Sequence, residues 1–136
     1  MKISVLLPYK ENFSPSYPGA VSIYVKDTTH CSNYKNSITI YGSTDYKKKL
    51  LNNYVNLPFK KEIFQSGSKI YVNNFLNCEK NNNSDIIEIH NRPAYVNSIF
   101  DKTKAKLVLY FHNDPLNMNG SKTVQERLFL LNTVEK

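Results

Sequence analysis

A cluster of polar residues follows the most apolar segment of this chain. His112, Asn113 and Asp114 come directly after residues 107–111, which are all large and apolar. Such a run leaves no solvent-facing side and predicts a strand buried on both faces. In an open α/β sheet, ligands bind at the carboxyl ends of the strands, so we expect these three residues to border a binding site.

A second cluster of the same kind lies upstream. Residues 85–90 also have a strand pattern, which ends in His90 and is followed by Asn91 and Arg92. Parallel strands meet at one edge of a sheet with their carboxyl ends together. The sequence therefore predicts that both clusters contribute to one shared site.

Several kinds of chemistry are open to these residues. His112 could act as a general base, as a hydrogen-bond donor to a sugar or phosphate, or as a structural residue. Arg92 beside His90 favours bidentate recognition of an anion. A metal site made of His90, His112 and Asp114 is conceivable, but it matches no standard ligand spacing, and we predict no metal.

The loop after the first expected strand contains one glycine, Gly19, just before an expected helix. The glycine-rich motifs of dinucleotide-binding and P-loop proteins are absent, so we predict no such cofactor. A glycine at a helix N-terminus still allows an anion to approach the free amides, and the alternative is a simple turn glycine. No G-x-S-x-G motif occurs and neither cysteine lies in a motif with histidine, which argues against nucleophilic hydrolysis.

Alternating strand-like and helix-like segments must position these residues. The alternation predicts an α/β, Rossmann-like, doubly wound and mainly parallel sheet with helices on both faces. We expect strands at 2–7, 37–41, around 62–64, 85–90 and 107–111, a short helix through 43–51, and further helices at 20–29, 70–76, from Pro93 and at 123–135.

The last expected helix begins with a capping-box pattern, Thr123 to Glu126. Its predicted apolar face contains Val124, Leu128 and Leu131, widened by Phe129 and Leu130. No C-terminal cap follows. Two interpretations remain open: a frayed terminal helix, or a chain that stops before the next strand of a larger protein.

Composition narrows the class of protein. A chain of 136 residues with a net charge of +7 corresponds to one domain. Its lysines are scattered, as on a solvated face, and we do not favour nucleic-acid binding. No run approaches the ~20 apolar residues of a membrane span. No signal-peptide pattern occurs at the N-terminus. Two cysteines without framework spacing, Cys31 and Cys78, suit reduced thiols in the cytoplasm.

The order of the motifs resembles the N-terminal half of a family-4 glycosyltransferase, in particular the lipopolysaccharide and capsule group. The resemblance rests on K-I-S-V-L-L-P, Y-P-G-A-V, D-I-I-E-I-H-N-R-P, K-L-V-L-Y-F-H-N-D-P and E-R-L-F-L-L in this order, and it covers nearly the whole chain. It implies one Rossmann-like domain of a two-domain GT-B enzyme, residues 1–136, truncated before the domain that binds the donor.

The resemblance also implies an activity and partners. Such enzymes transfer a sugar, with retention, from a nucleotide-sugar donor to a glycan or lipid-linked acceptor, in the cytoplasm or at the inner face of the membrane. His112 would be the catalytic residue facing the transferred sugar, Gly19 would lie near the donor diphosphate, and His90, Arg92, Asn113 and Asp114 would bind substrate. The first loop has one glycine where many members have two, and this chain alone should be inactive. The alternative is a stand-alone, non-catalytic α/β binding module.

Overall fold

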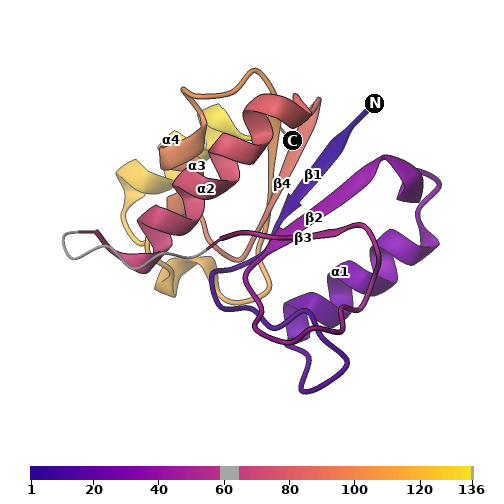
Figure 1. Cartoon of the computed structure of the whole chain (residues 1–136). Coiled ribbons are helices and arrows are strands. Elements are labelled where there is room, and N and C mark those ends of the chain that lie inside the picture. Colours follow the sequence, from indigo (N-terminus) through magenta and orange to yellow (C-terminus); the bar gives the residue numbers. More distant parts are fainter. Residues whose placement is uncertain (59–64, 136) are drawn as a thin grey trace.

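A computed structural model describes residues 1–58 and 65–135. In this part of the chain, a five-stranded, all-parallel sheet has the order β3-β2-β1-β4-β5 (Figure 1). The strands are β1 (Ile3–Leu6), β2 (Ile38–Gly42), β3 (Tyr54–Asn56), β4 (Ile86–His90) and β5 (Lys106–Tyr110). This arrangement confirms the predicted Rossmann-like α/β class.

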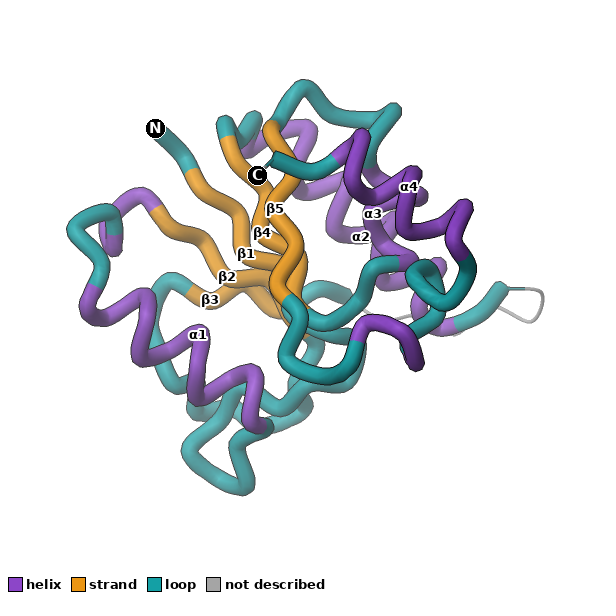
Figure 2. The backbone as a smooth tube through the Cα atoms, turned by 180° about the vertical axis from the view of Figure 1, so that it is seen from behind, coloured by secondary structure: helices purple, strands orange, loops and turns teal. Residues whose placement is uncertain are grey.

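Helices cover both faces of the sheet (Figure 2). On one face lies α1 (Ala20–Cys31); on the other lie α2 (Gly67–Asn82), α3 (Ala94–Ile99) and α4 (Val124–Thr133). Short 3₁₀ turns occur at Lys35–Ser37 and Pro115–Asn117. Side chains of β1 alternate between the two layers: Val5 packs in the core against α1, and Leu6 packs in the core beneath the other helices.

The strand order reverses between β1 and β4, which defines the topological switch point of the sheet. A non-glycine residue with positive φ follows each of these two strands: Lys10 (φ 65°) after β1 and Asn91 (φ 56°) directly after β4. Side chains at positive φ are uncommon outside glycine and cluster at functional sites. Two of the four described non-glycine residues with positive φ therefore lie after the strands that border the switch point; the other two are Tyr17 and Asn83.

Two of the predicted elements need correction, and a third falls outside the described residues. The expected strand at 62–64 lies outside the described residues, and the edge strand of the described sheet is β3. No helix forms through 43–51, where the described chain is a loop. The last strand is an edge strand: within β5 only Leu107 is buried, and Phe111 beyond it is 40% exposed, because no described strand covers its outer side.

The predicted apolar face of α4 is also wrong, although its capping box is confirmed. Val124, Leu128 and Leu131 are exposed, whereas Leu130 is buried. Beside it, Phe129 makes an edge-on contact with Phe100, with 5.1 Å between the ring centroids. The helix thus packs through the residues that we expected only to widen its apolar face.

Candidate functional site at the carboxyl edge of the sheet

His90, the last residue of β4, is in direct contact with His112, which follows β5. Nδ1 of His90 lies 3.0 Å from Nε2 of His112, within hydrogen-bond distance. His90 ends β4 and is only 2% exposed, whereas His112 is half-buried. The expectation that the two strands bring their histidines to one place is confirmed.

Aromatic rings hold this pair in position. His90 stacks on Tyr110, with the ring planes 7° apart and the centroids 4.8 Å apart. On the other side, Tyr24 of α1 meets His112 edge-on at 4.9 Å. Tyr24 could not be assigned to the site from the sequence, since it lies far away along the chain. Tyr110 was interpreted only as part of the apolar strand before His112.

Asn91 joins the ends of the two strands. Its amide donates to the carbonyl of Tyr110 (2.7 Å), and its side-chain Oδ1 accepts from the amide of His112 (3.3 Å). Arg92 turns back onto the same residue, donating from Nη1 to the carbonyl of Asn91 (2.7 Å). One donor of the Arg92 guanidinium is therefore already engaged in a hydrogen bond to the protein's own backbone.

Burial and neighbouring charges shift the pKa values of His112 and of Tyr110 beside it. Burial lowers the pKa of His112, the neighbouring His90 lowers it further, and the carboxylate of Glu11 opposes both effects. Burial raises the pKa of Tyr110, and Glu88 raises it further. Low proton affinity at His112 favours a neutral imidazole, which can both donate and accept a hydrogen bond.

Asn113 and Asp114 are exposed, and the side chain of Asp114 caps the turn that follows it. Its carboxylate accepts from the amide of Leu116 (3.0 Å) and from Nδ2 of Asn117 (2.6 Å), capping the 3₁₀ turn. Among residues 1–58 and 65–135, no three His, Cys, Asp or Glu side chains are grouped so that they could hold a metal ion.

Gly19 caps α1, but a carboxylate of the chain itself occupies this helix end. Oε1 of Glu11 accepts from the amide of Ser22 (3.0 Å). A Cβ atom added to Gly19 would lie 1.9 Å from the same oxygen, so glycine is needed for this contact. The role expected for Gly19 beside a diphosphate stays a prediction, and it requires Glu11 to move away.

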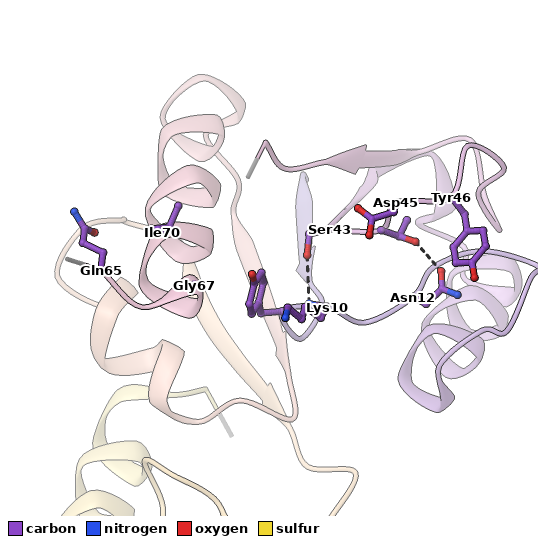
Figure 3. Close-up of a pocket in the computed structure, with 10 residues that line it drawn as sticks. Lys10, Asn12, Ser43, Asp45, Tyr46, Gln65, Gly67 and Ile70 are labelled. Atoms are coloured by element: carbon purple, nitrogen blue, oxygen red, sulfur yellow. Dashed lines mark hydrogen bonds between the residues drawn. The ribbon is translucent and has the colours of Figure 1, made fainter. Parts of the chain in front are cut away.

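A cleft of about 710 Å³ opens at the carboxyl ends of β1 and β2 (Figure 3). Side chains from the loops after these strands face the beginning of α2 across it. Thr44 donates to Oδ1 of Asn12 (2.6 Å), which ties the two loops together. The lining residues are Tyr9, Lys10, Asn12, Ser43, Thr44, Asp45, Tyr46, Gln65, Gly67 and Ile70.

This cleft was not predicted from the sequence. None of the residues predicted for the site is among those that line it in the described part of the chain. The carboxyl ends of β1 and β2 lie at the same edge of the sheet as those of β4 and β5, but the loops that follow β1 and β2 contain no histidine. Both groups of residues belong to the carboxyl edge, on opposite sides of the switch point.

Comparison with known proteins adds no identification. No protein-family model matches the chain, and no curated protein or solved structure resembles it significantly. Separately, no helix in the described ranges combines the length and the apolar character needed to cross a membrane.

Proposed function

We propose that this chain is the acceptor-side domain of a retaining glycosyltransferase and holds a hydroxyl-rich acceptor at the carboxyl edge of its sheet. The cleft over β1 and β2 carries this proposal. It combines the aromatic side chains of Tyr9 and Tyr46 with hydrogen-bonding groups of both kinds, among them the carboxylate of Asp45 and the ammonium of Lys10.

Such a lining suits a sugar. A pyranose has apolar C–H faces that pack on aromatic rings, and hydroxyl groups that donate to carboxylates and amides and accept from amines. Binding sites for small ligands typically have this mixture of apolar surface and a few polar groups that fix orientation. Tyr46 and Asp45 are both exposed, so their side chains are accessible to a ligand in the cleft.

The reaction requires more than this chain supplies. Transfer from a nucleotide-sugar needs the leaving diphosphate to be stabilised and the acceptor hydroxyl to be held close to the anomeric carbon. Glu11 at the N-terminus of α1 would repel a diphosphate. We therefore assign the donor mainly to a second domain and place the acceptor here, with His112 beside the transferred sugar.

We also propose a cell compartment for the reaction. We place the reaction in the cytoplasm or at the inner face of the membrane, where a nucleotide-sugar meets a glycan or lipid-linked acceptor. The net charge of +7 would favour peripheral contact with anionic lipids. The acceptor would then enter the cleft from the membrane surface.

A glycan array tests acceptor binding. The chain should bind a subset of oligosaccharides, and Tyr46→Ala or Asp45→Ala should weaken that binding about tenfold or more, equivalent to about 1.4 kcal/mol. Tyr34→Ala is the matched control, because Tyr34 is also an exposed tyrosine but does not line the cleft. An array without specific binding, or equal loss in all three variants, would refute the proposal.

One observation favours a second candidate, a stand-alone α/β binding module without catalysis. The carboxylate of Glu11 already accepts a hydrogen bond from the amide of Ser22 in the first turn of α1. It therefore occupies the position in which the phosphate of a donor would bind. The coding sequence downstream of Lys136 separates the two. A second Rossmann unit with a Glu-rich motif would support the transferase, and a stop codon would support the module.

A further inference from the structure

Three side chains form a line that ends at the carboxyl edge. Oε2 of Glu88 lies 3.7 Å from Nε2 of His90, and Nδ1 of His90 lies 3.0 Å from Nε2 of His112. Nε2 of His90 is buried and has no hydrogen-bond partner among the described residues. A buried polar atom without a partner is costly, so its placement beside a carboxylate calls for an explanation.

We propose that Glu88 and His90 are positioning residues that hold His112 in one tautomer, with its proton on Nε2 and with Nδ1 left to accept a hydrogen bond from a hydroxyl of the ligand. The identity of that ligand as a sugar rests on the function proposed above. The order of protons along the three side chains does not depend on it.

The tautomers follow from the charge at the buried end. A carboxylate only accepts hydrogen bonds, so Glu88 favours the proton of His90 on the facing Nε2. Nδ1 of His90 is then an acceptor, and its 3.0 Å neighbour, Nε2 of His112, must be the donor. The carboxylate thus determines the protonation of a ring that it does not touch.

The surroundings keep both rings in this geometry. Tyr110 stacks on His90, Tyr24 packs edge-on against His112, and the amide of His112 is fixed by Asn91. Nδ1 of His112 makes no hydrogen bond within the described ranges, and the ring is half-buried. An acceptor atom is therefore available on a side chain whose position is set from two sides.

Acid should remove this acceptor. Protonation of His112 places a second proton on Nδ1, after which the ring can only donate. The titratable groups facing the pair are Glu88 and His90 on β4, Tyr110 on β5, Tyr24 on α1 and Glu11 in the loop before α1. Burial and His90 lower the pKa of His112 against the opposing effect of Glu11, which keeps Nδ1 available near neutral pH.

Long-range ¹⁵N–¹H correlation spectra of the imidazole rings test the proposal without any ligand. In the wild-type chain at neutral pH, the nitrogen shifts of His112 should identify the tautomer protonated on Nε2. Glu88→Gln should move the two nitrogen shifts of His112 toward each other, because a neutral amide can face Nε2 of His90 as donor or acceptor. Glu88→Asp, which retains a carboxylate, should preserve the wild-type preference.

Asp85→Asn is the matched control, since Asp85 precedes β4 at the opposite end of the strand. A His112 protonated on Nδ1 in the wild type, or shifts in Glu88→Gln that equal those in Asp85→Asn, would overturn the inference. These spectra are recorded without sugar, so a negative glycan array leaves them valid. A wrong tautomer likewise leaves binding in the cleft untouched.

Discussion

His112 combines exposure with constraint. Its ring is accessible enough to meet a ligand, yet one edge is held by a buried histidine and one face by a tyrosine. Burial and the neighbouring imidazole disfavour its protonation, so folding makes this side chain a weaker base than it is in the unfolded chain. Because the pKa of His112 is lower in the folded chain, the stability of the protein should depend on pH.

The free energy of unfolding should fall as the pH drops below the unfolded pKa of histidine, about 6.5. The folded pKa of His112 is lowered, so between the two values the unfolded chain binds more protons and acid favours unfolding. His112→Gln should flatten this part of the profile in chemical denaturation measured from pH 7.5 to 5. His30→Gln, at an exposed position, should not. Identical profiles for all three proteins would contradict the assignment.

The residues of the site could be predicted only in part. His90 and His112 were identifiable because each follows an apolar segment, and strand ends at one edge must converge. Glu88 was not singled out, although strand alternation places it on the same face as His90. Glu11 and Tyr24 carried no such signal. Their contact with the site depends on how α1 and its preceding loop pack on the sheet, which periodicity alone does not determine.

At the level of elements, α4 shows how an apolar pattern can mislead. Its sequence contains apolar residues around most of the circumference, so helical spacing allowed two different buried faces. The contact of Phe129 with Phe100, which follows α3, selects the face that includes Leu130. Tertiary packing decided what the local pattern left open.

Neighbouring leucines of α4 provide a direct check. Leu130→Ala should lower the free energy of unfolding by about 2–5 kcal/mol, the usual cost of truncating a buried leucine. Leu131→Ala, at a position that is 58% exposed, should change it by no more than about 0.5 kcal/mol. Urea denaturation of the two variants measures both values. Equal costs, or the reverse order, would show that α4 packs through the face predicted from the sequence.

The parallel sheet, by contrast, was predictable from the sequence, because strand and helix patterns alternate along most of the chain. The weak positions were the edges. β3 is only three residues long and mostly exposed, so it lacks the burial that makes a strand recognisable. β5 was recognised by its apolar run but was wrongly expected to be buried on both faces. An edge strand has only one neighbouring strand, so an apolar run does not by itself show that the strand is buried on both faces.

Across the whole molecule, a buried carboxylate connects the amino ends of the strands. Glu79 near the end of α2 accepts from Oγ of Ser4 in β1 (2.7 Å) and from the amide of Ser84 before β4 (2.6 Å). The bond to Ser4 joins residues 75 positions apart in the chain, whereas the bond to Ser84 spans five positions. We expect them to stabilise the amino edge of the sheet, which lies opposite the edge where we propose that the ligand binds.

Glu79→Gln should therefore destabilise the protein by about 1.5–3 kcal/mol, the range for hydrogen bonds to a charged group. The carboxamide has one acceptor oxygen in place of two, so at least one donor from Ser4 or Ser84 loses its partner. Lys80→Gln, an exposed neighbour, serves as the control in the same thermal and urea unfolding experiments. A Glu79→Gln variant as stable as this control would show that the network does not contribute to stability.

The central claim is that the carboxyl edge of the sheet binds a sugar. The most direct test is an amide ¹⁵N–¹H spectrum of the chain titrated with an oligosaccharide selected on the glycan array. We predict that the resonances that shift belong to residues around Asn12, Ser43 and Asp45 in the cleft and to His112 at the neighbouring strand end. Shifts confined to the opposite edge, around Glu79 and Ser84, or no saturable shifts at all, would contradict the account.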